Sequence, residues 1–193
     1  MTDGHKWLQV PYDCGFAIVK NRTIHQRATT QWSSYLPTLG EGDRVPSAFL
    51  PELSRRARGM PVYAMLKTLG RQGVAEMVEH HCALARQFAE MLAREPGVLV
   101  LNTVSLNQVI VNFGEGDAKA RRAATEAVIA RIQNDGVCFA AGAQWREDWV
   151  MRLSIALGAT TARDIEISVA AIVAGWRAEQ LARQCGTAQP NVA

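Results

Sequence analysis

The apolar positions of the middle of the chain recur every three or four residues, which is the period of an amphipathic helix. One such pattern covers residues 62–69 and is interrupted by Gly70. A longer one follows, and Pro96-Gly97 ends it. The apolar face of the longer helix consists of Val74, Met77, Val78, His81, Ala85, Phe88 and Leu92.

Beyond residue 97 the period changes repeatedly between that of a strand and that of a helix. We predict strands over 98–104, 108–113, 137–141 and 149–156, and helices over 117–134 and from about residue 162 onward. Gly136 marks the end of the first of these helices. Thr161 lies three residues before Asp164, a variant of the capping box that starts a helix. The order β-β-α-β-β-α predicts a compact α+β domain that closes its own core.

The N-terminal third of the chain has a different pattern. Residues 14–20 are almost continuously apolar, as in a strand buried on both faces of an α/β sheet. Leu8–Val10 is the local candidate for a partner strand, although Pro11 limits it. From residue 21 to about 51 the pattern dissolves, which predicts a long, mobile, functional loop that includes Trp32 and Tyr35.

Composition and charge exclude several classes of protein. The chain of 193 residues is 48% hydrophobic and 20% charged, as in soluble globular proteins. A net charge of +3, without interleaved basic and aromatic residues, predicts no nucleic-acid partner. Four widely separated cysteines predict neither a metal site nor a disulfide framework. With no signal peptide and no membrane-length apolar run, we expect a cytoplasmic protein with no membrane contact.

The most unusual group of residues is His5-Lys6-Trp7, directly before the first apolar stretch. A lysine amine attacks a carbonyl carbon only when it is neutral, and burial or a neighbouring cation favours the neutral form. A lysine between histidine and tryptophan is also compatible with a purely structural role. The spacing alone leaves both readings open.

Several segments resemble, in order, the pyridoxal-phosphate-dependent group II amino acid decarboxylases, which include the aromatic amino acid and glutamate decarboxylases. The segments are His5-Lys6-Trp7, Val10-Pro-Tyr-Asp-Cys14, the apolar stretch to Lys20, Leu53-Ser-Arg-Arg-Ala-Arg-Gly-Met-Pro-Val-Tyr63, residues 70–81 and Arg152-Leu-Ser. The resemblance implies an α/β protein, the C-terminal part of a fold-type I transferase-like fold. It implies the end of the large cofactor domain (1–60), connecting helices (61–97), a small α+β domain (98–184) and a disordered tail (185–193).

The resemblance also implies roles for individual residues. Lys6 corresponds to the lysine that forms the Schiff base with pyridoxal 5'-phosphate, and His5 to the histidine against the cofactor phosphate. Tyr35, 29 residues after Lys6, corresponds to a tyrosine on a mobile catalytic loop that protonates the carbon from which carbon dioxide has left. A phenol can donate one proton, and a closing loop excludes water, so a tyrosine on such a loop suits the protonation step.

Two further positions fit the family less well. Many relatives have an asparagine near the phosphate where this chain has Asp3, and an anion there would repel the phosphate. We therefore leave Asp3 out of the binding set. Arg152 occupies a position where related aminotransferases hold the substrate carboxylate, but a structural role is favoured for it here.

The expected activity is decarboxylation of an L-amino acid to an amine and carbon dioxide. A non-catalytic remnant or dimerisation module of a decarboxylase is one alternative, and an aminotransferase that needs Arg152 is another. In the family, the groups that bind the cofactor ring precede the lysine. We therefore expect a C-terminal portion that works as a homodimer or with a missing N-terminal half. The sequence does not indicate which amino acid is the substrate.

Overall fold

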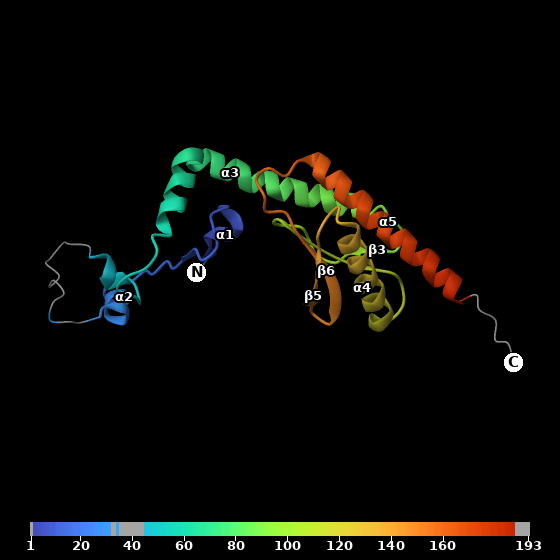
Figure 1. The fold of residues 1–193 in the computed structure, drawn as a ribbon, viewed down its shortest axis with the longest axis horizontal. Coiled ribbons are helices and arrows are strands. Elements are labelled where there is room, and N and C mark those ends of the chain that lie inside the picture. Colours follow the sequence, from blue (N-terminus) through green and yellow to red (C-terminus); the bar gives the residue numbers. More distant parts are fainter. Residues whose placement is uncertain (1, 32–33, 35–44, 188–193) are drawn as a thin grey trace. The chain divides into compact units, whose positions relative to one another are not determined.

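The computed structural model describes residues 2–31, 34 and 45–187. The chain forms two compact units, Met1–Arg71 and Gln72–Ala193 (Figure 1). The boundary falls inside the segment 61–97, which the sequence predicts as connecting helices. The predicted division at residues 60 and 97 stays a prediction.

The N-terminal unit is built from short elements. Strand β1 (Thr2–Asp3) pairs antiparallel with β2 (Gly15–Phe16), and the one-turn helix α1 (Gly4–Trp7) follows β1 directly. Helix α2 (Arg22–Thr29) begins at Asn21, whose side chain accepts a hydrogen bond from the backbone N–H of Ile24 at 2.9 Å. A 3-10 helix, η1 (Pro46–Phe49), lies against α2, because the Thr29 hydroxyl donates to the Ala48 carbonyl at 2.7 Å.

Two predictions for this unit are wrong. Residues 14–20 are not one buried strand: β2 covers two residues, its partner is Thr2–Asp3 rather than Leu8–Val10, and Ile18 is 88% exposed. A strand buried on both faces needs neighbours along both edges, and within the described residues β2 has one. The predicted loop over 21–51 contains α2 and η1, since an Asn cap and a polar helix give little apolar periodicity.

Helix α3 (Gly59–Leu92) contains a break at Gly70, where the sequence pattern is also interrupted. Gly70 has φ 63° and ψ −174°, a backbone conformation that glycine adopts without steric cost. No heavy atom would lie within 4 Å of an added Cβ there, so the conformation alone requires the glycine.

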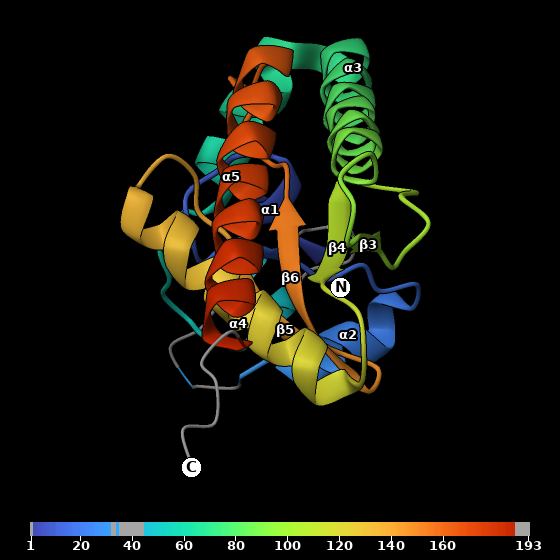
Figure 2. The ribbon, with the colours of Figure 1, turned by 90° about the vertical axis from the view of Figure 1, so that its right-hand side faces the viewer.

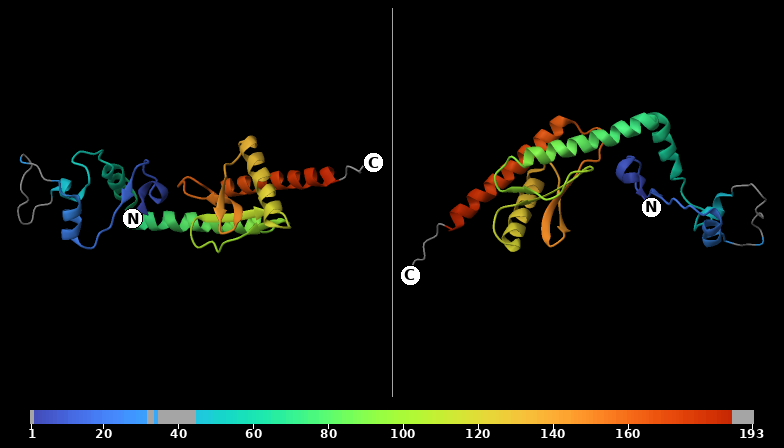
Figure 3. Two further views of the ribbon diagram at one scale, coloured as in Figure 1. Left: turned by 90° about the horizontal axis from the view of Figure 1, so that it is seen from below. Right: turned by 180° about the vertical axis from the view of Figure 1, so that it is seen from behind.

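The C-terminal unit contains a four-stranded antiparallel sheet in the order β3-β4-β6-β5 (Figure 2). Its strands are β3 (Val98–Val100), β4 (Gln108–Phe113), β5 (Ala141–Trp145) and β6 (Asp148–Ser154). Helix α4 (Ala118–Asp135) packs on the sheet, and α5 (Ala162–Thr187) packs on α4 (Figure 3). The second segment of α3 completes the core through Phe88 and Leu92.

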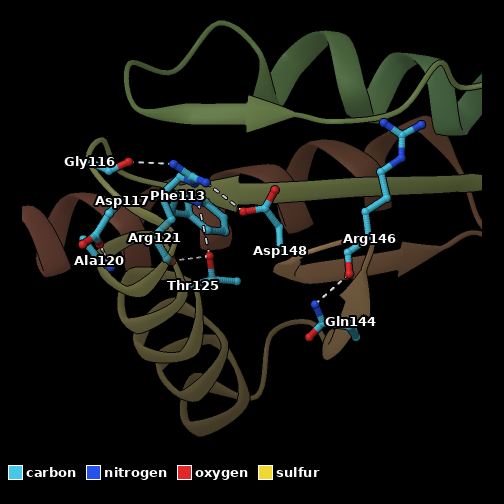
Figure 4. Close-up of polar contacts among 9 residues, drawn as sticks. All are labelled: Phe113, Gly116, Asp117, Ala120, Arg121, Thr125, Gln144, Arg146 and Asp148. Atoms are coloured by element: carbon cyan, nitrogen blue, oxygen red, sulfur yellow. Dashed lines mark hydrogen bonds and ion pairs between the residues drawn. The ribbon is translucent and has the colours of Figure 1, made fainter.

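The helix ends of this unit are specified locally. The Asp117 carboxylate accepts from the Ala120 N–H at 2.8 Å, and Gly136 ends α4 in the left-handed conformation. Thr161 and Asp164 form the predicted reciprocal cap at the start of α5. Arg121 of α4 donates to the Asp148 carboxylate of β6 at 2.8 Å and thereby joins helix and sheet (Figure 4).

The predicted order β-β-α-β-β-α is confirmed, but several boundaries differ. The first strand ends at Val100 rather than at residue 104, and the last is Asp148–Ser154 rather than 149–156. The third strand is Ala141–Trp145 rather than 137–141, and Val137 and Phe139 are 54% and 79% exposed. The strand includes Gly142 because the indole of Trp149 lies where a side chain would be, 2.6 Å from an ideal Cβ. Helix α5 reaches Thr187, past residue 185 where the sequence predicts the tail.

Candidate functional site

The predicted cofactor lysine lies on α1, and the local sequence explains how this turn is held. Gly4 is buried, and its N–H donates to the Cys14 carbonyl at 2.8 Å. A Cβ at position 4 would lie 2.8 Å from Phe16 Cε2 and 3.0 Å from Cys14 Sγ. Glycine therefore allows α1 to lie directly against β2, and this contact fixes the backbone of the two residues that follow.

Lys6 forms an ion pair within this turn. Its Nζ lies 2.7 Å from Asp3 Oδ2, and its side chain is 67% exposed. The hydrogen bond from Lys6 holds the pKa of the Asp3 carboxyl below its usual range, so Asp3 is the anionic partner. The predicted site does not include Asp3, whereas the structure places its carboxylate against the Lys6 amine. An acid and a base three residues apart on a helical turn are the signal that could have indicated this contact.

His5 lies on the same turn and has one ring nitrogen without a partner. Its Nδ1 is buried and has no hydrogen-bond partner within the described part of the chain, while Nε2 lies 3.9 Å from Asp3 Oδ2. The imidazole stacks on the Tyr12 ring with centroids 4.3 Å apart and an interplanar angle of 23°. Tyr12 is 83% exposed and was not singled out from the sequence.

The loop over residues 9–14 places the Tyr12 ring on His5. Gln9 and Asp13 at its ends have positive φ values of 54° and 74°, which are uncommon for residues other than glycine. The Asp13 carboxylate accepts from the Arg58 guanidinium, which lowers the pKa of that carboxyl. The Asp13 end of the loop is thus tied to Arg58.

The other predicted residues do not join this cluster. Tyr35, like Trp32, lies outside the described residues. Arg152 belongs to the C-terminal unit, where it is exposed on β6 and pairs in register with Ile110 and Ala141. His81 is fully buried as its apolar stripe predicts, and burial lowers the pKa of its imidazole. The neighbouring His80 Nε2 lies 3.0 Å from the Thr160 carbonyl oxygen.

No helix in the described ranges is both long and apolar enough to cross a membrane. The same residues contain no group of three or more His, Cys, Asp or Glu side chains placed to hold a metal ion.

Comparison with known proteins identifies the class to which this fold and lysine segment belong. The sequence model described as "Pyridoxal-dependent decarboxylase conserved domain" matches residues 1–113. The aromatic-L-amino-acid decarboxylase of Sus scrofa is 25% identical over 189 residues, which are 96% of this chain and 37% of the relative. The L-aspartate decarboxylase of Thermococcus kodakarensis is 32% identical over 112 residues, 58% of this chain and 27% of the relative.

Solved structures agree in fold. A TDC structure from Oryza sativa with PLP and tryptamine superposes with a TM-score of 0.73 at 13% identity, covering 79% of this chain and 33% of that one. The predicted fold class, part of a fold-type I α/β protein, is confirmed. The chain belongs to the pyridoxal-dependent decarboxylase family, the group II amino acid decarboxylases. It spans between about a quarter and two fifths of the length of these relatives.

The cofactor of the family, pyridoxal 5'-phosphate, suits the groups on α1. An exposed primary amine at Lys6 matches its aldehyde, and the buried Nδ1 of His5, which has no partner among the described residues, can donate to a phosphate oxygen. The Asp3 carboxylate would repel a phosphate, and in this structure it is directed to Lys6 Nζ. The residues present therefore fit this cofactor.

Proposed function

We propose that this segment supplies the cofactor lysine of an enzyme that decarboxylates an L-amino acid to an amine and carbon dioxide. The observation that carries the proposal is the position of Lys6 beside His5 on one helical turn, inside the region that the family model matches; the His5 Nδ1 is buried and has no partner among the described residues. Lys6 would hold the cofactor covalently through its Nζ. His5 is the neighbouring donor for the phosphate.

Each residue has a defined task in this proposal. When bound, the cofactor provides an electron sink for the bond that releases carbon dioxide. Lys6 Nζ fixes the position of the cofactor, and the Gly4–Cys14 hydrogen bond and the Tyr12 stack keep Lys6 and His5 oriented. Tyr35 Oη donates the proton that completes the amine product. A hydroxyl in that role must lie within hydrogen-bond reach of the carbon or act through one water.

The substrate is proposed only as a class. The named activities of the relatives differ, with one acting on aromatic L-amino acids and another on L-aspartate. Since the chain covers 37% of one relative and 27% of the other, the groups that select between these side chains are not assigned here.

Attachment of the cofactor is the direct test. Pyridoxal 5'-phosphate is added to the purified protein, the product is reduced with borohydride, and the modified peptide is identified by mass spectrometry. We expect the label at Lys6, its loss in Lys6→Ala, and no effect of Lys20→Ala, since Lys20 is the next lysine along the chain. A label shared equally among the lysines, or none at Lys6, would refute the proposal. Release of carbon dioxide from aromatic and acidic amino acids then tests the reaction.

A further inference from the structure

The amine that has to react with the cofactor is already bound to a carboxylate in this structure. Lys6 Nζ and Asp3 Oδ2 are 2.7 Å apart. A lysine attacks a carbonyl carbon through its lone pair, which is available only in the neutral form, whereas an adjacent carboxylate favours the ammonium. We propose that Asp3 acts as a latch: its ion pair with Lys6 Nζ must open before that amine can react with the cofactor aldehyde. This inference rests on the proposed role of Lys6.

The backbone at both ends of the latch is fixed. Asp3 pairs in register with Gly15 in the small sheet, and the Gly4–Cys14 hydrogen bond holds the turn that carries Lys6. Although Asp3 precedes α1, its side chain makes no capping hydrogen bond to the helix, so its carboxylate is directed to Lys6 instead. The side chains of Asp3 and Lys6 are 41% and 67% exposed, which leaves the amine accessible to an aldehyde.

The chemical step shows why the latch and the cofactor bond are alternatives. The Lys6 ammonium first gives one proton to solvent, and the neutral Nζ then attacks the aldehyde carbon. A carbon–nitrogen double bond forms, and the aldehyde oxygen leaves as water with the two remaining amine protons. The ion pair with Asp3 is lost as the amine is consumed. Only about one in 2,500 ordinary lysine side chains is neutral near pH 7, so loss of the proton as well as opening of the ion pair has to precede the attack.

The first test measures the reactivity of the Lys6 amine without the cofactor. The protein is methylated with formaldehyde and cyanoborohydride, and mass spectrometry gives the rate at Lys6 relative to Lys20, for which no ion pair is found in the described residues. We expect Asp3→Asn to raise this ratio about two- to fivefold, as befits an exposed ion pair. Added salt should raise the ratio in the wild type and leave it unchanged in the variant.

Matched controls separate the latch from general effects. Glu52→Gln removes another carboxylate of the same unit, one that pairs with Arg55, and should leave the Lys6 ratio unchanged. Asp3→Ser, which keeps a small polar side chain, should act like Asp3→Asn. Hydrogen exchange at the Gly4 amide reports whether the turn stays folded. An unchanged ratio in Asp3→Asn would overturn the latch, and so would an increase accompanied by loss of Gly4 protection.

A second measurement distinguishes the latch from the proposed function. Pyridoxal 5'-phosphate followed by borohydride should label Lys6 faster in Asp3→Asn than in the wild type. If the formaldehyde ratio rises but pyridoxal 5'-phosphate never labels Lys6, the proposed function fails and the latch stands. If Lys6 is labelled equally fast in both proteins and the formaldehyde ratio is unchanged, the latch fails and the proposed function stands.

Discussion

Gly4→Ala tests whether the close contact between α1 and β2 maintains the lysine segment. The added methyl group would lie 2.8 Å from Phe16 Cε2, 3.0 Å from Cys14 Sγ and 3.1 Å from Val10 Cγ2. Carbon atoms attract best at about 3.5–4.0 Å, so the side chains of three different residues must each move. No single side-chain rotation relieves all of these contacts.

The magnitude follows from opposing terms. Overpacking costs typically about 1–3 kcal/mol, and the better helix propensity of alanine returns up to about 1 kcal/mol. A net loss of about 1–2 kcal/mol corresponds to roughly a 5- to 30-fold increase in the fraction of molecules in which the α1 turn is open. We expect the amide at position 4, which bonds to the Cys14 carbonyl, to exchange faster by that factor in hydrogen-exchange mass spectrometry.

Gly59→Ala is the matched control for this experiment. It makes the same substitution in the same unit at the start of α3, where nothing lies within 4 Å of an added Cβ. We expect exchange at position 4 to be unchanged in this variant. If Gly4→Ala exchanged no faster than Gly59→Ala, the contact between α1 and β2 would not be what holds the turn.

Two further predictions concern the two histidines in defined environments. Tyr12→Leu removes the ring that stacks on His5 and should weaken pyridoxal 5'-phosphate binding about 2- to 12-fold in a spectroscopic titration. Tyr12→Phe keeps the ring and should bind the cofactor normally. Equal weakening in both variants would show that the hydroxyl matters and not the ring. The pKa of buried His81 is lowered from 6.5, chiefly by burial, so below that pH the unfolded chain binds a proton that the folded chain does not. The free energy of unfolding of the wild type, measured in denaturant titrations, should therefore decrease as the pH is lowered from about 7 to about 5. His81→Phe should make this decrease smaller. The same decrease in both proteins would contradict the assignment to His81.

The C-terminal unit could be predicted from its sequence because its helices are specified locally. Asp117, Gly136 and the Thr161–Asp164 pair mark helix ends within a few residues of their hydrogen-bond partners. Strand β5 was misplaced because its position depends on pairing with β6 and on the Trp149 ring over Gly142. These contacts are made between neighbouring strands, so the hydrophobic pattern within β5 itself does not indicate them.

The candidate site was predictable in its chemistry but not in its geometry. A short motif indicates Lys6 and His5, and the structure places them on one turn. The contact of Asp3 with Lys6 depends on residues 4–7 being helical. The sequence pattern predicts an extended segment at Leu8–Val10 and no helix before it. The Tyr12 stack depends on the positive φ values of Gln9 and Asp13, which no residue pattern in this segment indicates.

The exposed apolar residues after β2 have a consequence for the behaviour of the chain at high concentration. Ile18 is 88% exposed and Val19 46%, and neither belongs to a strand in the described part of the chain. A short β-branched apolar segment of this kind can pair with the same segment of another molecule and begin aggregation. The charge of Lys20, directly after it, opposes such stacking as a gatekeeper. We therefore expect Lys20 to limit association through this one segment at high protein concentration, a role separate from the chemistry of Lys6.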